Sequence, residues 1–350
     1  MTIGQRIKQA RKSNSLSLRD LGAQVGISPM AISKYERDQD TPSSGVLLRI
    51  AQALEVNIDF FFRPSKIVVE LQAYRKHSSL GVKEQDAIKM RIQEWAERYL
   101  EVESLFPDER HEVSLPVFKV NSLQEVEQAA SDMREAWSLG LDPIENLIQL
   151  LEDKGIKVGV VSGFDHFDAC TFMADVVPVI VTKSDLPGDR QRFNIGHELG
   201  HLVLDVQGEM NLEHAAHRFA AAFLIPEKTA RFELGSSRTD LDMNELYMLK
   251  HKYGLSMQAW VYRAKDLGII SENTAARLFQ RFRTNNWHRK EPGEAYPPEK
   301  LMRMERLVYR ALAEDMITRS RAQELLGEPL QQRWVTEATQ QNDLAVHLGD

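Results

Sequence analysis

Apolar residues recur every three or four positions through the first 62 residues, which predicts a series of short amphipathic helices. The expected helices cover residues 3–13, 18–25, 28–37 and 43–54, followed by a short fifth helix from Asn57. Ser17 and Ser28 stand where an N-cap is needed, and Pro29 suits the first helical position. The pattern therefore predicts a five-helix domain at the N-terminus.

Beyond this domain the pattern predicts longer helices around a small sheet. A charged helix over 82–106 carries one apolar stripe, typical of a packing helix, and ends at Pro107. The β-branched run 156–161 predicts a strand. Further strands are expected at 67–69, 162–164 and 178–181, and further helices at 126–137, 143–154, 213–226, 246–253, 257–267 and within 303–326.

Composition narrows the class of protein. With 43% hydrophobic and 27% charged residues among 350, the chain can form two or three globular domains. The net charge of −7 gives no global basic field, so any contact with nucleic acid is expected to be local. The lone cysteine, Cys170, excludes an intrachain disulfide framework. Without a signal core or an apolar run of membrane-spanning length, we expect a cytoplasmic protein that does not enter a membrane.

A His-Glu-x-x-His pattern at residues 197–201 is the main candidate for chemistry. On a helix, His197 and His201 lie on one face and can bind one Zn²⁺, with Glu198 beside the metal-bound water. Leu199, Leu202 and Val203 then form the core-facing side. A chance match has odds of roughly one in a hundred, so the surrounding sequence decides.

The helix that follows supplies this context. Glu213, Ala216, His217 and Ala220 share one face, and the alanines would allow a close approach to the first helix. The two helices resemble the ImmA/IrrE-type metallopeptidases, in which Phe-x-x-x-His-Glu-x-x-His precedes Glu-x-x-Ala-Asn/Asp-x-Phe-Ala-Ala. The resemblance extends upstream to about residue 125. It implies a zinc-dependent endopeptidase with Glu198 as general base and with His197, His201 and Glu213 as metal ligands.

One position departs from that family pattern. His217 stands where the family usually has Asn or Asp, so it could orient a ligand, donate to an oxyanion or compete for the metal. Arg218 is the other candidate for the oxyanion. His214 points about a quarter turn away and is expected to be an ordinary surface histidine.

The N-terminal helices resemble the Cro/repressor-like (XRE) domains, through Ile32-Ser33-x-Tyr35-Glu36-Arg37 and the following Thr41-Pro42-Ser43. The resemblance implies that the second helix of the motif enters the major groove of a double-stranded DNA operator. Residues 1–62 carry eight basic and six acidic side chains, a small local excess of positive charge. The alternative to a DNA-binding domain is a domain that binds another protein. The expected DNA contacts are Arg19, Gln24, Ser28, Met30, Ser33, Lys34 and Arg37.

These patterns predict an α+β, mostly helical chain with a small sheet in a zincin-like domain. The expected parts are a helix-turn-helix domain (1–63), a linker with packing helices (64–124), an ImmA/IrrE-like metallopeptidase domain (125–286) and a helical extension with a mobile end (287–350). The helix pair within 246–267 is interpreted as ordinary framework rather than a second DNA site.

The predicted function is a DNA-binding transcriptional regulator that cleaves a specific helix-turn-helix repressor, in stress response or mobile-element control. The alternative is a repressor or antitoxin-like regulator whose zinc domain is a non-catalytic sensor or scaffold. The presence of Glu198 favours cleavage, because a structural zinc site needs no general base. The expected partners are an operator and a protein substrate, with a homodimer as an option.

Overall fold

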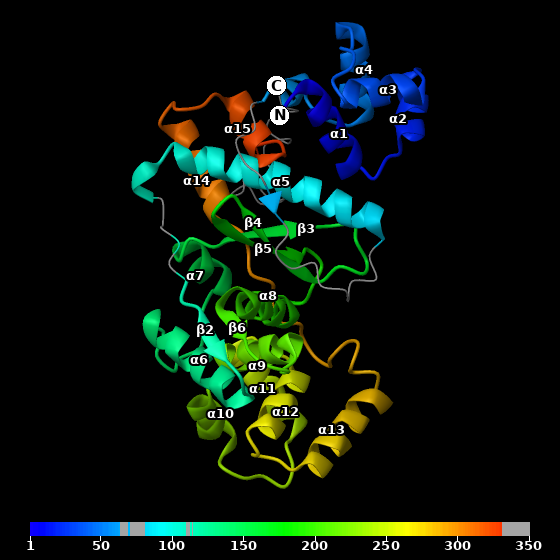
Figure 1. Ribbon diagram of the computed structural model, residues 1–350. Coiled ribbons are helices and arrows are strands. Elements are labelled where there is room, and N and C mark those ends of the chain that lie inside the picture. The colour runs from blue at the N-terminus through cyan, green and yellow to red at the C-terminus, as the bar shows by residue number, and fades with distance from the viewer. Residues whose placement is uncertain (64–68, 71–80, 110–112, 114, 331–350) are drawn as a thin grey trace, which may run out of the picture. The chain divides into compact units, whose positions relative to one another are not determined.

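The computed structural model describes residues 1–63, 69–70, 81–109, 113 and 115–330 (Figure 1). The chain forms two compact units, residues 1–97 with 111–301 and residues 98–110 with 302 onward. The described residues contain α1 to α15, two 3₁₀ helices and six short strands. This confirms the α+β, mostly helical class.

The N-terminal domain consists of α1 (Ile3–Ser13), α2 (Leu18–Val25), α3 (Pro29–Glu36), α4 (Ser44–Ala53) and the 3₁₀ helix η1 (Ile58–Phe62). Ser17 forms a capping box with Asp20, and the Ser28 side chain accepts from the N–H of Ala31, so both predicted caps are confirmed. The short fifth helix is 3₁₀ rather than α. Each element of this domain contributes one buried face to the domain's core, which includes Ile7, Leu21, Ile32, Ile50 and Phe60.

The main sheet has the strand order β1-β4-β5-β3. Its strands are β1 (Val69–Glu70), β3 (Lys157–Val161), β4 (Ala169–Ala174) and β5 (Val177–Lys183). β3 is parallel to β5, while β4 is antiparallel to both β1 and β5. The strand expected at 162–164 is wrong, because these residues are the loop that leaves β3. Of the strand expected at 67–69, residues 67 and 68 lie outside the described residues.

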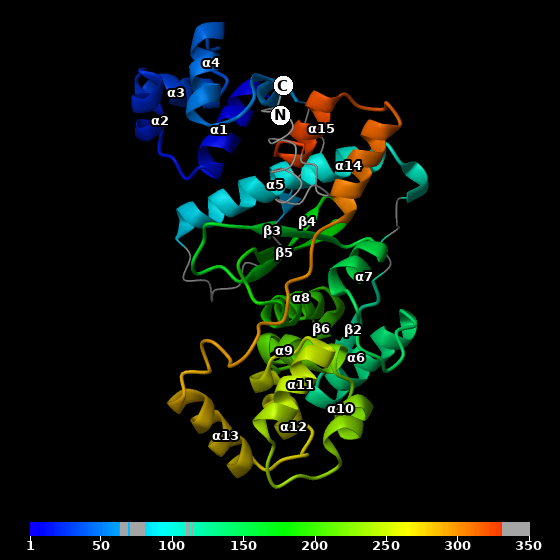
Figure 2. The same ribbon diagram turned by 180° about the vertical axis from the view of Figure 1, so that it is seen from behind.

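A second, two-stranded sheet pairs β2 (Phe118–Val120) with β6 (Leu204–Val206) in parallel. β6 follows directly from α8 (Gly188–Val203), the helix that carries the His-Glu-x-x-His pattern. On one side of α8 lie β4 and β5, and on its other side lies α9 (Leu212–Leu224), as both views show (Figures 1 and 2). The candidate metal helix is therefore a central layer of its unit.

Helices complete this unit: α5 (Val82–Ser104, residues 82–97 here), α6 (Leu123–Ala136), α7 (Leu147–Asp153), α10 (Glu227–Leu234), α11 (Met243–Tyr253), α12 (Met257–Asp266) and α13 (Glu272–Thr284). Helix α7 begins at Leu147 and not at Pro143, because the Asn146 side chain caps it by accepting from the N–H of Gln149. Leu199, Phe219 and Trp260 are fully buried in the core between these helices. That core fixes α8 and α9 side by side.

Residues 287–301 have no regular structure beyond a turn, but two of their carboxylates are buried and form ion pairs with neighbouring helices. Glu291 pairs with Lys250 at 3.0 Å and accepts from the N–H groups of Met257 and Gln258. Glu299 pairs with Arg192 and accepts from the N–H of Ile148. Both glutamate side chains are less than a tenth exposed, although most residues of this irregular segment are exposed.

The second unit joins residues 98–104 of α5 and the 3₁₀ helix η2 (Pro107–Glu109) to α14 (Arg303–Ala313) and α15 (Arg319–Leu326). Val102, Leu307, Val308 and Leu325 are buried together in its small core. The two helices expected within 303–326 are confirmed. Among the residues described, no helix is long and apolar enough to cross a bilayer.

Candidate metal centre

The close approach of α8 and α9 depends on small residues on both helices. A Cβ added at Gly200 would meet Ala216 Cα at 3.2 Å, and one added at Gly196 would meet the Ala220 methyl at 3.4 Å. The sequence singled out the two alanines for this approach, and the glycines opposite them complete it. The contact lets the first turn of α9 reach the histidine face of α8.

Three candidate ligand side chains meet at this crossing. His197 Nε2 lies 3.0 Å from His201 Nε2, and the two carboxylate oxygens of Glu213 lie 3.3 Å from His197 Nε2 and 3.5 Å from His201 Nε2. Tetrahedral zinc with bonds of about 2.0–2.1 Å separates its ligand atoms by about 3.3 Å. The spacing of these atoms therefore fits one Zn²⁺.

Glu198 belongs to the same cluster. One of its oxygens lies within 4.8 Å of ligand nitrogens of His197 and His201, so it is a rival to Glu213 as a ligand by proximity alone. The Glu198 carboxylate, however, also accepts a hydrogen bond from the Thr171 hydroxyl, with 2.7 Å between Oγ1 and Oε2. That bond occupies one of the two carboxylate oxygens, Oε2.

Burial sets the protonation of the cluster. It lowers the pKa of His197 to about 3, with smaller contributions from His217 and His201, and so keeps this imidazole in the neutral form that binds metals. Burial also raises the pKa of Glu198 to about 7, opposed by the Thr171 hydrogen bond and assisted by the negative charge of Glu213. A carboxyl in this state can both take and release a proton near neutral pH.

Thr171 lies on β4 and was not singled out from the sequence. Its hydroxyl is buried against Glu198, and its neighbour Cys170 is buried as well. Burial raises the pKa of the Cys170 thiol, so this cysteine is held neutral rather than as a nucleophile. The only local signal was a threonine within an apolar segment, which is also common in strands that carry no site.

His217 and Arg218, the two candidates for stabilising an oxyanion, have different surroundings. The His217 ring stacks on Phe193 at 5.7 Å between centroids and lies 4.4 Å from the His197 ring. Burial lowers the pKa of His217, so its imidazole is neutral. The Arg218 guanidinium is instead engaged by Glu127 at 2.5 Å and Asp266 at 2.9 Å. His214 is exposed, as expected.

A cavity of about 710 Å³ opens beside His217. Its walls come from the first half of α8, from α9 and α12, and from residues 288–291. Phe193 and Tyr262 contribute aromatic surface, and the remaining lining is rich in charged side chains. No sequence pattern predicted this cavity, because its walls are far apart along the chain.

The residues expected to contact DNA lie on one pair of neighbouring helices, α2 and α3. Arg19, Gln24, Ser28, Met30, Lys34 and Arg37 are exposed, and Ser33 is half-buried. Met30 is an exposed apolar side chain of this surface, with an exposed fraction of 62%. Arg37 Nε donates to the Ser33 carbonyl at 3.1 Å, so its side chain folds back along α3.

Family models match two parts of the chain. Residues 7–61 match the model described as helix-turn-helix, and residues 154–265 match a peptidase model described as the IrrE N-terminal-like domain. The chain joins an XRE-type helix-turn-helix domain to an ImmA/IrrE-type peptidase-like domain. In this fusion protein, the second match contains α8, α9 and every residue of the candidate metal centre.

Relatives of the fusion protein are similar to its N-terminal part. An uncharacterized transcriptional regulator in the ATPase CF(0) region of Rhodospirillum rubrum is 42% identical over 60 residues, 17% of this chain and 56% of the relative. The repressor protein C2 of Salmonella phage P22 is 29% identical over 79 residues, 23% of this chain and 37% of the relative. The chain thus spans about half or less of these relatives' length.

A crystal structure of the P22 c2 repressor in complex with a synthetic operator is also similar. It is 34% identical, covers 17% of this chain and 92% of that one, and has a TM-score of 0.17. The family-model match over residues 7–61 confirms the helix-turn-helix domain that the sequence resemblance had implied.

Proposed function

We propose that the fusion protein is a DNA-binding transcriptional regulator whose second domain is a zinc-dependent endopeptidase acting on a specific repressor-type protein, in stress response or mobile-element control. The observation that carries the proposal is the meeting of His197, His201 and Glu213 beside the buried carboxyl of Glu198. A structural zinc site has four protein ligands and no need of a base, whereas three ligands leave a position for water.

The chemistry assigned to the chain is proton transfer. Zinc, when bound, supplies an acidified water molecule and polarises the scissile carbonyl. Glu198 accepts the proton of that water and later passes it to the leaving amine, for which a pKa of about 7 is well matched to neutral solution. Thr171 holds one oxygen of Glu198 in place during both transfers.

His217 is the better of the two candidates for stabilising the oxyanion. Its neutral imidazole carries one N–H that can donate, and its ring lies 4.4 Å from that of the ligand His197. The guanidinium of Arg218 is already paired with two carboxylates. We therefore assign the donor role to His217 and a positioning role to Arg218.

The DNA partner follows from the N-terminal domain. We propose that α3 enters the major groove of an operator with paired half-sites, with Lys34 and Arg37 near the phosphates and Ser28, Met30 and Ser33 near bases. Arg19 and Gln24 of α2 complete the surface. A paired site would be bound by a homodimer, as in other proteins of this docking geometry.

The deciding experiment incubates the zinc-loaded protein with helix-turn-helix repressors encoded beside it and looks for one discrete cut by mass spectrometry. Glu198→Gln should retain about one zinc per chain and abolish the cut, because it keeps the shape of the side chain and removes the proton acceptor. His201→Ala should lose the metal as well.

The same variants distinguish the non-catalytic alternative in cells. If the zinc domain is only a sensor or scaffold, the regulatory response of Glu198→Gln equals that of the wild type while His201→Ala fails. If cleavage is the output, both variants fail, and operator binding by Glu198→Gln remains intact.

A further inference from the structure

The cavity of about 710 Å³ next to the metal centre is a candidate for substrate recognition. The cavity lies next to the metal ligands, because His217 lines it and the His217 ring is 4.4 Å from the ring of His197. Phe193, whose ring stacks on that of His217, also lines the cavity. A peptide that places its scissile bond at the metal would therefore set a neighbouring side chain in this cavity.

The acidic groups of the cavity wall are already compensated. Asp189 and Glu291 both face the buried ammonium of Lys250, at 3.5 and 3.0 Å. Asp266 is paired with Arg218 at 2.9 Å. An incoming cation would thus find no carboxylate that lacks a partner here.

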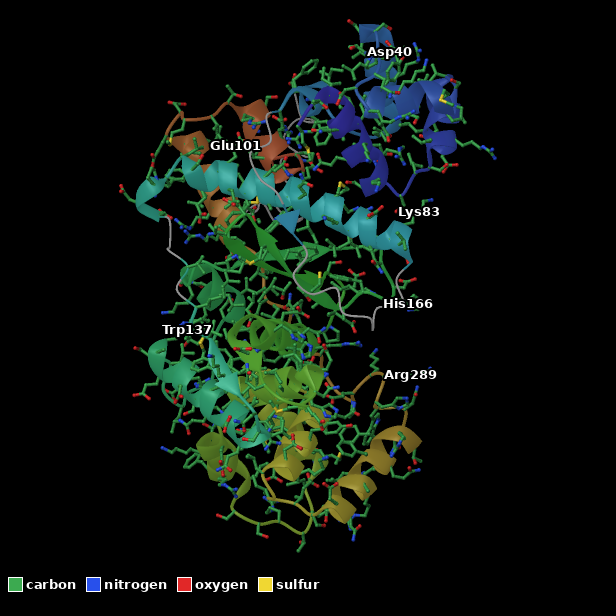
Figure 3. All side chains as sticks on the ribbon, viewed as in Figure 1. Asp40, Lys83, Glu101, Trp137, His166 and Arg289 are labelled. Atoms are coloured by element: carbon green, nitrogen blue, oxygen red, sulfur yellow. The ribbon has the colours of Figure 1, made fainter. Side chains whose placement is uncertain are left out.

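Two cations of the wall have no such close partner. Arg289 makes no ion pair within the described part of the chain, and Figure 3 shows it on the segment that follows α13. The Lys265 ammonium is 3.9 Å from its nearest carboxylates, those of Asp266 and the exposed Glu272. Within the residues that the structure describes, Arg190 pairs only with Asp168, in an exposed contact that is weak in water.

The surroundings strengthen this positive charge. Residues 277–290 carry five arginines or lysines and no acidic residue, in a chain whose net charge is −7. His288 and Arg289 of that run line the cavity. Such a local field attracts an anionic segment and orients it before contact.

We propose that this cavity is a specificity subsite for an acidic side chain, Asp or Glu, of the protein substrate, with Lys265 and Arg289 as its charge partners and the Tyr262 ring packing on its methylene groups. The inference rests on the proposed peptidase function. It adds a substrate class: the cleaved repressor carries an acidic residue within a few positions of the scissile bond.

The test uses the full-length, zinc-loaded protein and a random peptide library whose cut ends are sequenced. Asp and Glu should be enriched about tenfold at one fixed distance from the cut. The double variant Lys265→Glu/Arg289→Glu should remove this preference or replace it by Lys and Arg. The matched control Arg281→Glu/Arg283→Glu changes the net charge equally at exposed positions outside the cavity and should leave the preference in place.

Cleavage without an acidic preference, or with one that survives the double variant at residues 265 and 289, overturns the inference and leaves the peptidase intact. If no peptide is cut, the peptidase proposal has failed, and the inference is judged by binding alone. Fluorescence anisotropy then compares Glu-containing with Gln-containing peptides on the zinc-loaded Glu198→Gln variant. A preference for Glu that the double variant abolishes supports the subsite. Equal binding of both peptides, or displacement of the Glu peptide by inorganic phosphate at equal concentration, overturns it.

Discussion

The hydroxyl of Thr171 donates a hydrogen bond of 2.7 Å to Oε2 of Glu198, and both side chains are buried. A strand of the sheet therefore restrains a carboxylate carried by the metal helix. Since a hydrogen bond to a charged group contributes about 1.5–3 kcal/mol, Thr171→Val should lower kcat roughly tenfold or more. Zinc content and KM should change little, and Thr171→Ser should restore most of the rate. A rate for the valine variant equal to that of the wild type would remove Thr171 from the proposed machinery.

The burial of Glu198 should make the stability of the metal-stripped protein depend on pH. Its folded pKa of about 7 exceeds the ordinary 4.5, so the stability it contributes is complete below pH 4.5 and is lost as the pH rises through 7. Between pH 5 and 8, the wild type should lose about 2–3 kcal/mol of unfolding free energy relative to Glu198→Gln. Urea unfolding of both proteins in chelator measures this difference. The histidines contribute equally to both proteins, so their effect cancels in the comparison. Parallel plots of unfolding free energy against pH for the two proteins would contradict the prediction.

The helix crossing should control metal affinity. Gly200→Leu places a side chain where a Cβ alone already lies 3.2 Å from Ala216 Cα, so α9 and its Glu213 must move away from the histidines. We expect zinc affinity to fall on the order of tenfold, in the range seen when the support of metal ligands is disturbed. Competition with a chromophoric chelator measures the affinity. Gly45→Leu, in a helix position with open space around it, is the control and should bind zinc like the wild type.

Operator binding should depend on α3 and on salt. Lys34 is exposed near the end of α3. Its replacement by alanine should weaken binding of the full-length protein to all operator variants. It should also reduce the slope of log binding constant against log salt concentration by about one. Electrophoretic titrations at several salt concentrations provide both quantities. Lys8→Ala, an exposed cation of α1, is the matched control. A larger loss for Lys8→Ala would place the DNA on another face of the domain.

Local signals made much of the fold predictable. The N-caps at Ser17 and Ser28 and the helical spacing around His197 and His201 lie within a few residues of sequence, so α2, α3 and α8 could be predicted closely. The second metal helix could be predicted for the same reason. The choice of Glu213 as the third ligand came from the resemblance, and the distances between the ligand atoms came only from the structure.

Long-range pairings account for what was missed. The segment Ala169–Ala174 has few β-branched residues, and it is a strand because β1 and β5 pair with its two edges. Thr171 could not be linked to Glu198 until that pairing was known. The parallel β2–β6 pair and the ion pairs of Glu291 and Glu299 likewise join residues far apart in the chain.

The ion pairs that anchor residues 287–301 limit how far the C-terminal side of the peptidase-like domain can be shortened. The family-model match ends at residue 265, yet Lys250 and Arg192 find their buried carboxylate partners at Glu291 and Glu299. A truncated version that stops before residue 287 would keep every metal ligand but would remove both carboxylate partners, and breaking a buried ion pair costs several kcal/mol. The minimal soluble peptidase fragment should therefore extend to about residue 301, and shorter versions should aggregate on expression.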